Sequence, residues 1–497
     1  ESMALNNKLK GMNLTPEELS GLQQAFLTSY AKEAKIKPAD FEAHRQYHQA
    51  RMQVIALKYA KTPEDFNGLL NAVKADLSTL PKPSVVETHA MQENRLKMGK
   101  AVDQSFELLT KFGPEGADAD GFVKGLQRTD ALPEAMGARQ EAIAKMAQEY
   151  LGIKEPLKVV APDTDPLSGA QIFILKKGDE VVGVYKVFTN NGKGPVTIMN
   201  ELGAGRTLWS LGLKKSIPVD SLGAWRLGES GEIGYMMAGA GGKDFYGYFK
   251  EIGKLELGSA ARVEKVAEIQ GRVESMAKAM AEMHQAGPTG KMDAGEKKAS
   301  LDKALVALDA MKGKLPSETY HAMRERLAKL GEGYLTHDIP GHITHGDAHP
   351  GNFFMDKDGK ITMIDLETSM ESVSKSGKGT KSPLGDVGRF VESMALNNKL
   401  KGMNLTPEEL SGLQQAFLAA YAKQAKIKPA DFEAHRQYHQ ARMQVTALKY
   451  AKTQEDFDGL LAVVKMDLAK PTTIGDSAPW MKGAPDSARP LLEERVY

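Results

Sequence analysis

His345-Gly346-Asp347-Ala348-His349-Pro350-Gly351-Asn352 is a short polar loop sequence, and Asp365 follows its final Asn by thirteen residues. The Asp347 carboxylate could orient a hydroxyl group and accept its proton, which is the work of a general base. Asn352 and Asp365 would supply an amide oxygen and a carboxylate oxygen. Such hard oxygen ligands are the ones that Mg²⁺ prefers.

Two short apolar segments, 353–355 and 361–364, flank a turn at 356–359 and predict a β-hairpin. The hairpin would bring Asn352 and Asp365 together. An Asp, an Asn five residues later and a second Asp behind a short strand have the spacing of kinase catalytic loops.

These residues resemble the motif of the aminoglycoside-phosphotransferase and choline-kinase-like family, the small-molecule branch of the protein-kinase-like fold. The resemblance implies a bilobal α+β fold, with a small antiparallel β lobe, a large mainly helical lobe and, in this chain, extra N-terminal helices. It also implies ATP- and Mg²⁺-dependent phosphoryl transfer to a hydroxyl, with Asp347 catalytic and Asn352 and Asp365 holding the metal. A pseudokinase-like binding or structural module is the alternative.

The segments 170–176 and 181–188 are rich in β-branched and aromatic residues and predict a second hairpin, like that of a kinase small lobe. Lys186 lies among apolar residues near its end, and a buried Lys needs an anion. In the family this Lys binds nucleotide phosphates and pairs with a Glu on the next helix. Glu201, in the helical segment 197–209, is the candidate, with Glu180 and Glu232 as weaker alternatives.

Segment 233–242 resembles the strand and glycine-rich hinge that contact adenine, with Met236 or Met237 against the ring. The turn that would cover the phosphates contains Ser168 and Gly169 but no G-x-G-x-x-G, so it departs from the protein-kinase pattern. Glu367 follows Asp365 where protein kinases have Gly, and it is a candidate to assist a second metal ion.

A long duplication is the other large feature. Residues 1–77 recur as 392–468, and the copies differ only at positions 28, 29, 33, 55, 63, 67, 71, 72 and 75 of the first. The second copy begins inside the predicted helix 386–396. We therefore expect residues 1–80 to be the tail of a preceding kinase unit, and the parent protein to be a tandem array. A separate helical module is the rival interpretation.

Helix signals divide the chain. Thr15-Pro16-Glu17-Glu18 is a capping box, repeated in the second copy. His435 and His439, repeating His44 and His48, are four residues apart on one helix face, and we interpret them as solvated or substrate-facing rather than as zinc ligands. The predicted domains are a duplicated helical segment 1–80, a helical linker 81–150, a small lobe 151–242, a large lobe 243–471 and an extended tail 472–497.

Composition restricts the surroundings. The chain has 497 residues, 41% hydrophobic, with a net charge of +1 and no cysteine. There is no basic excess to suggest a nucleic-acid partner, and no apolar run of the length that a membrane span needs. The expected partners are a nucleotide and a hydroxyl-bearing acceptor, small molecule or protein. We expect the protein to be cytoplasmic, or exported by a bacterium as an effector or toxin that acts in another cell's cytosol.

Overall fold

The computed structural model describes residues 103–112, 118–161, 170–188, 193–229 and 231–469. The chain divides into two compact units, Glu1–Thr88 and His89–Tyr497, and all described residues belong to the second. The first copy of the duplication, most of the predicted linker up to residue 102, Ser168, Gly169 and the tail beyond residue 469 therefore lie outside the described residues.

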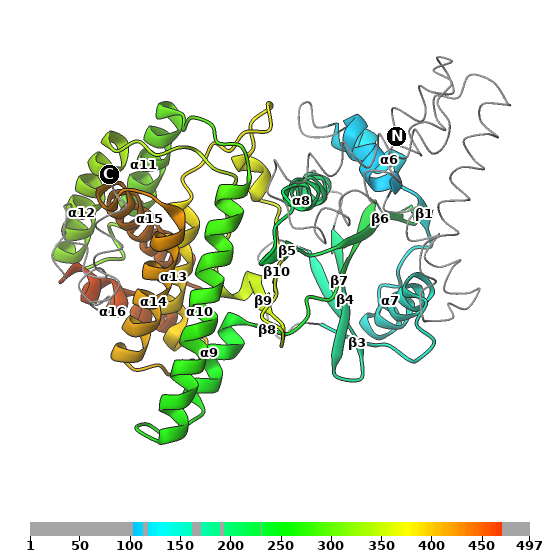
Figure 1. Ribbon diagram of the computed structural model, residues 1–497. Helices are drawn as coiled ribbons and strands as arrows, with labels where there is room; N and C mark the ends of the chain where they lie inside the picture. Colours follow the sequence, from blue (N-terminus) through cyan, green and yellow to red (C-terminus); the bar gives the residue numbers. More distant parts are fainter. Residues whose placement is uncertain (1–102, 113–117, 162–169, 189–192, 230, 470–497) are drawn as a thin grey trace, which may run out of the picture. The chain divides into compact units, whose positions relative to one another are not determined.

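A six-stranded sheet forms the core of the small lobe (Figure 1). Its order is β1-β6-β7-β4-β3-β2, and all neighbours are antiparallel except β1 and β6. The strands are β1 (Arg128–Thr129), β2 (Lys158–Val160), β3 (Gln171–Lys177), β4 (Glu180–Phe188), β6 (Ser221–Leu227) and β7 (Glu232–Ala238). The predicted hairpin is β3 and β4, which confirms that part of the sequence analysis.

Side chains of β4 point alternately to the two faces of the sheet, and each face carries an apolar cluster. Tyr185 and Val187 join a cluster with Trp225 on the side of α7 (Met136–Leu151). Phe188 joins a second cluster, on the side of α6 (Ala119–Gly125) and α8 (Lys193–Ser210). Successive strand side chains point to opposite faces, so Lys186 lies on the α8 side.

The large lobe is mainly helical and has one large apolar core. Its helices are α9 (Phe245–Gly253), α10 (Ala260–Ala286), α11 (Ala294–Asp309), α12 (Ser317–Thr336), α13 (Leu384–Leu400), α14 (Pro407–Ala425), α15 (Pro429–Lys449) and α16 (Gln454–Leu468). The second copy of the duplicated sequence spans the end of α13 through α16 and contributes to this core. The mixed α+β, two-lobed architecture predicted from the sequence is thus confirmed.

Local signals place the helix ends. Thr406 and Glu409 form the reciprocal capping box at the start of α14, as the repeated motif predicts. Helix α10 ends before Gly287. The charged stretch 292–333 forms two helices, α11 and α12, because the chain turns at 310–316 and Pro316 precedes the first residue of α12. Among the described residues, none of the helices combines the length and apolarity needed to cross a bilayer.

A second, four-stranded sheet of order β5-β10-β9-β8 supports the candidate site. It consists of β5 (Ser216–Pro218), β8 (Lys243–Asp244), β9 (Phe353–Met355) and β10 (Ile361–Met363). Strands β9 and β10 form the predicted hairpin, in which Phe353 pairs with Met363. This register places Asn352 and Asp365 at the same end of the hairpin.

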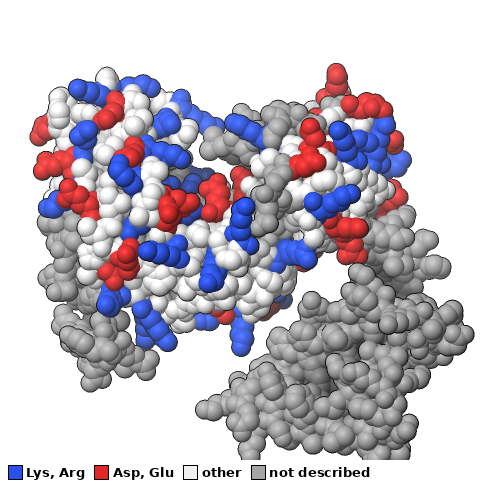
Figure 2. Space-filling model, turned by 90° about the horizontal axis from the view of Figure 1, so that it is seen from above, with Lys and Arg blue, Asp and Glu red and all other residues white. Residues whose placement is uncertain are grey.

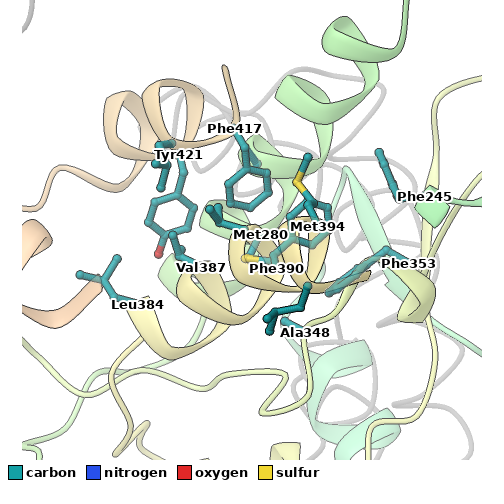
Figure 3. Packing of buried hydrophobic residues seen from close by; sticks show 14 of the residues in the cluster. Phe245, Met280, Ala348, Phe353, Leu384, Val387, Phe390, Met394, Phe417 and Tyr421 are labelled. Atoms are coloured by element: carbon teal, nitrogen blue, oxygen red, sulfur yellow. The ribbon is translucent and has the colours of Figure 1, made fainter. Parts of the chain in front are cut away.

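Aromatic packing joins this hairpin to the helices (Figure 3). The Phe390 ring on α13 stacks on Phe417 with centroids 4.4 Å apart, and its edge contacts Phe353 at 6.0 Å and Phe245 at 5.9 Å. Each such pair contributes roughly 0.5–1.5 kcal/mol beyond burial. Ala348, from the polar loop, is fully buried in the same cluster. The large-lobe core therefore includes part of the loop that carries Asp347.

Candidate active site

A buried ion pair joins the two lobes. Lys186 Nζ lies 3.2 Å from both carboxylate oxygens of Glu201 and 2.6 Å from Asp365 Oδ1. Lys186 and Glu201 are buried, whereas the Asp365 side chain is 39% exposed. Strand β4, helix α8 and the residues after β10 thus contribute one charged group each, and the structure brings together three residues singled out in the sequence.

Electrostatics around Lys186 favour its charged form. Burial opposes the charge, but the carboxylates of Asp365 and Glu201 outweigh it and raise the pKa of Lys186 above its ordinary value. Burial, together with the charge of Asp365 and against the attraction of Lys186, raises the pKa of Glu201 to about 7. One ammonium group therefore contacts two carboxylates. When both carboxylates are ionised, the three groups together carry a net charge of −1.

Asp365 has a backbone φ of 54°, in the left-handed region that non-glycine residues seldom adopt. Such strained positions concentrate at functional sites. Burial would raise its pKa, but Lys186 and the nearby histidines hold the pKa of Asp365 below its usual value. The carboxylate is therefore ionised and partly exposed, as a metal ligand must be.

Asn352 is buried at the end of the loop, and its Nδ2 donates to the carbonyl of Asp347 at 2.9 Å. This bond fixes the amide orientation and leaves Oδ1 as the atom that could bind a cation. Across the described parts of the chain there is no cluster of three or more His, Asp or Glu that could hold a metal. The oxygen pair of Asn352 and Asp365 fits Mg²⁺, which takes few protein ligands and completes its shell with phosphate and water oxygens.

Asp347 faces a guanidinium group. Arg389 Nη2 on α13 lies 2.5 Å from Asp347 Oδ1, and both side chains are 29% exposed. Arg389 Nη1 also donates to the carbonyl of Gly346 at 3.3 Å. Gly346 itself has φ 81°, and a Cβ there would lie 2.7 Å from Thr368 Oγ1, so the turn requires glycine. Sequence analysis did not identify Arg389.

A buried carboxylate anchors the loop from below. Asp386, in the first turn of α13, accepts hydrogen bonds from the backbone N–H of His345 at 2.7 Å and of Gly346 at 2.9 Å. His284 Nε2 lies 3.0 Å from the same carboxylate, and His284 Nδ1 lies 2.8 Å from the Tyr421 hydroxyl. Asp386 therefore positions the backbone on either side of His345, just before the Asp347 side chain.

Histidines of the loop have separate structural roles. His345 Nε2 bonds the carbonyl of Ile364 at 2.9 Å, which ties the loop to the end of the hairpin. The His349 ring stacks on Tyr246 with centroids 5.9 Å apart, and its Nδ1 accepts from the N–H of Gly351. Burial lowers the pKa of His349, against the raising effect of Asp347.

The structure separates the candidates for the adenine contact. Met237 packs in the apolar cluster on the Lys186 side of the sheet, whereas Met236 packs with Trp225 and Tyr185 on the opposite side. Glycines follow in the segment 239–242. A Cβ on Gly239 would lie 1.9 Å from the Val181 carbonyl oxygen, so the backbones of this segment and β4 approach too closely for a side chain.

The weaker alternatives for the Lys186 partner lie elsewhere. Glu180 and Glu232 are the first residues of β4 and β7. Glu232 Oε1 accepts from Arg139 Nη2 at 2.7 Å. Glu367 is half-buried near the ion pair, and burial, opposed by Lys186 and reinforced by Asp365, raises its pKa.

The two histidines of α15 are buried, so of the two predicted settings, solvated or substrate-facing, the solvated one is wrong. His435 Nδ1 lies 3.0 Å from Ser382 Oγ and Nε2 lies 2.8 Å from the His337 carbonyl. His439 lines a cavity of about 600 Å³ between α11, α13 and α15. The cavity wall also includes Gly346 and Arg389, so it opens beside the Asp347 loop.

Comparisons with known proteins agree with the motif. Residues 238–372 match the phosphotransferase enzyme family called APH. No curated protein matches the chain in sequence. The segment that matches the family contains Asp347, Asn352 and Asp365. The chain is therefore similar to phosphotransferases over the part that contains the catalytic-loop motif and the β9–β10 hairpin.

Similar solved structures include three kinases. A glucosamine kinase is 14% identical, with 63% of this chain and 93% of that chain covered and a TM-score of 0.42. The aminoglycoside phosphotransferase APH(4)-Ia, in complex with AMP-PNP and hygromycin B, is 13% identical, with 66% and 98% covered and a TM-score of 0.41. The choline kinase LicA from Streptococcus pneumoniae is 14% identical, with 72% and 98% covered and a TM-score of 0.35.

Proposed function

We propose that this protein is an ATP- and Mg²⁺-dependent phosphotransferase that transfers the γ-phosphoryl group to a hydroxyl of an acceptor. The observation that carries the proposal is the contact of Lys186 with Glu201 in one lobe and Asp365 in the other. A cation held between two carboxylates, one of them partly exposed, is arranged to bind phosphate oxygens as soon as a nucleotide enters. The similarity of residues 238–372 to phosphotransferases supports the same conclusion.

Lys186 would bind the nucleotide phosphates, and Glu201 would hold the ammonium in place. Met237 is the better of the two methionines for the adenine edge, because it shares the Lys186 side of the sheet. Ser168 and Gly169 remain candidates for the turn over the phosphates. Phosphoryl transfer needs little covalent help from a protein, so this positioning and charge compensation would supply most of the rate.

Asn352 and Asp365 would hold Mg²⁺, which would neutralise charge on the phosphate oxygens. Asp347 would orient the acceptor hydroxyl and receive its proton as the new oxygen–phosphorus bond forms and the bond between the γ- and β-phosphoryl groups breaks. Arg389 must yield part of its contact with Asp347 for that hydroxyl to approach. The Asp386 carboxylate keeps the loop fixed meanwhile.

A non-catalytic binding module is the second candidate, and one observation favours it. Both reactive carboxylates are paired with cations of the protein itself, Asp365 with Lys186 and Asp347 with Arg389. A protein that binds nucleotide without turnover could keep these pairs permanently. Turnover in the presence of an acceptor separates the two functions.

A thermal-shift titration with ATP, with and without Mg²⁺, tests the proposal. ATP should raise the melting temperature of the wild type, and Mg²⁺ should add to the shift. Asp365→Ala should lose the Mg²⁺-dependent part, whereas Asp358→Ala, in the exposed turn of the same hairpin, should keep it. Asp347→Asn should bind nucleotide normally but lower turnover by roughly a hundredfold or more. Equal turnover in Asp347→Asn and wild type would overturn the catalytic assignment.

The duplication supports a further proposal about the organisation of the protein. The copy at 392–468 is an integral part of the large-lobe core, with Phe417, Tyr421 and Tyr438 fully buried. A near-identical sequence at 1–77 is suited to complete another large lobe of the same kind, so we propose a tandem kinase-repeat protein. Intact mass of the native protein tests it. We also propose that the protein acts in the cytosol, either of the cell that makes it or of another cell after export. Fractionation of both kinds of cell would test this.

A further inference from the structure

The cavity between α11, α13 and α15 adjoins the catalytic loop through Arg389. This side chain lines the cavity, and its Nη2 contacts Asp347 Oδ1 at 2.5 Å. Arg389 Nε is buried and has no hydrogen-bond partner among the described residues. A volume of about 600 Å³ is in the range of small-molecule sites. An acceptor in this cavity would meet Arg389 on its way to Asp347.

Most carboxylates of the cavity wall already have hydrogen-bond or ion-pair partners within the protein. Asp386 accepts from two backbone amides and faces His284. Glu296 pairs with Lys381 at 2.7 Å, and Asp293 caps the first turn of α11. The remaining carboxylate of the wall is Glu371. The wall therefore has little free negative charge with which to attract a polycation.

The cations of the wall are less fully paired. Lys297 is buried against Asp338, and Lys381 pairs with Glu296. Within the described ranges, Lys303, Arg442 and Lys449 form no ion pair. On the face of the molecule in Figure 2, positive and negative side chains are interspersed.

Arg442 is an exposed side chain of α15 that is tied to α11 by a hydrogen bond. Its Nη1 donates to Ser300 Oγ at 3.2 Å, and Ser300 Oγ lies 2.9 Å from the Tyr438 hydroxyl. The Tyr438 ring stacks on Tyr334 with centroids 4.2 Å apart. The planar guanidinium fork is itself pre-organised, so little freedom is lost for each hydrogen bond that it forms with an anion.

His439 adds an unsatisfied polar group to the same wall. The side chain is more than nine-tenths buried, and its Nε2 has no hydrogen-bond partner among the described residues. Helix α13 packs against it at two glycines, and a Cβ on Gly388 would lie 3.0 Å from the His439 Cβ. By contrast, His435, one turn earlier, uses both ring nitrogens within the protein.

We propose that the acceptor is a small hydroxyl compound that itself carries an anionic group, a phosphate or a carboxylate, held in this cavity by Arg442 and Lys303. His439 would bind a neutral polar group of the same molecule, and Arg389 would lie between its hydroxyl and Asp347. The inference rests on the proposed phosphotransferase function and assigns its acceptor class. It predicts discrimination against polycationic acceptors, which would meet unpaired cations in the cavity.

Calorimetric titration with Mg²⁺ and saturating AMP-PNP tests this assignment, because the nucleotide site is then filled. The probes are glucose 6-phosphate and gluconate, compared with glucose and glucosamine. At least one anionic probe should bind, and it should bind about tenfold or more tightly than glucose and glucosamine. The two anionic probes distinguish phosphate from carboxylate as the preferred group.

Charge reversal locates the binding. Arg442→Glu and Lys303→Glu should each weaken the anion by about tenfold or more. Lys329→Glu, on the exposed side of α12 and outside the cavity, makes the same change in net charge and should leave binding unaltered. Arg442→Gln provides a milder variant, and unchanged thermal unfolding shows that each variant is folded.

The inference is overturned if neither anion binds, if glucose or glucosamine binds as tightly, or if Arg442→Glu and Lys329→Glu behave alike. Failure of the proposed function would look different. In that case AMP-PNP with Mg²⁺ would not stabilise the protein, while anion binding sensitive to Arg442→Glu could still be measured without nucleotide.

Discussion

Replacing Asp386 by alanine should cost more stability than its single carboxylate suggests. The side chain is 2% exposed and accepts from His345 N–H at 2.7 Å and Gly346 N–H at 2.9 Å, with His284 Nε2 at 3.0 Å. Alanine would leave three donors without this partner, two of them on the buried residues His345 and His284. Breaking a buried charged network in this way costs roughly 3–5 kcal/mol, and we expect that loss in the free energy of unfolding.

The variant Asp386→Asn separates the contribution of the charge from that of the hydrogen bonds to the free energy of unfolding. The amide keeps one oxygen acceptor but loses the charge and turns an N–H₂ group toward one of the former donors. A hydrogen bond to a charged group contributes about 1.5–3 kcal/mol, so Asn should cost about 2 kcal/mol. Urea denaturation followed by circular dichroism measures both variants. Asp302→Ala is the matched control, because that carboxylate is 55% exposed in a pair with Lys298 and should contribute at most about 0.5 kcal/mol.

The contribution of Asp386 to stability should also depend on pH. Burial would raise the pKa of Asp386, but His284 and the loop amide outweigh it and hold the pKa below its usual value. Stability from Asp386 is therefore present above the pKa of an unfolded Asp and lost as pH falls through the lower folded value. A loss below about 1 kcal/mol in Asp386→Ala, or one equal to that of Asp302→Ala, would refute the anchoring role.

Three further outcomes are expected. Glu201→Gln should weaken ATP binding by about tenfold in titration calorimetry, because Lys186 then keeps one carboxylate partner, whereas unchanged affinity would contradict the pairing. Burial lowers the pKa of His435 from 6.5 to about 4, so its share of stability is present above pH 6.5 and about 3 kcal/mol is lost as pH falls toward 4; His435→Gln should flatten that part of a urea–pH series. Thr406→Ala should lower the unfolding free energy by about 1 kcal/mol, and no change would mean that the bond to Glu409 is not stabilising.

Features encoded over short distances could be predicted from the sequence. The β9–β10 hairpin follows from apolar runs on either side of a turn, and the pairing of Lys186 with Glu201 spans fifteen residues. The loop anchor could not be predicted, because its partners are far apart in the chain. His284 and Tyr421 are separated by 137 residues, and only tertiary packing brings them together.

One local signal of this arrangement was nevertheless present in the sequence. Asp386 and Arg389 are three residues apart in a helix predicted from its apolar spacing, so they lie on one face beside each other. Choosing between Met236 and Met237 required the register of β4 with β7, in which Lys186 pairs with Tyr235. Register is a property of the sheet and not of either strand. Sequence could therefore name both methionines but could not separate them.

Helix α13 contributes successive turns to two tasks. Asp386 fixes the backbone of the Asp347 loop, and Phe390 packs at the centre of the large-lobe core. We therefore expect the loop to open only together with the large-lobe core, rather than by a separate local opening of low free energy. Amide hydrogen exchange at His345 and Gly346 would then proceed through global unfolding, and heat would abolish activity and large-lobe structure in a single transition.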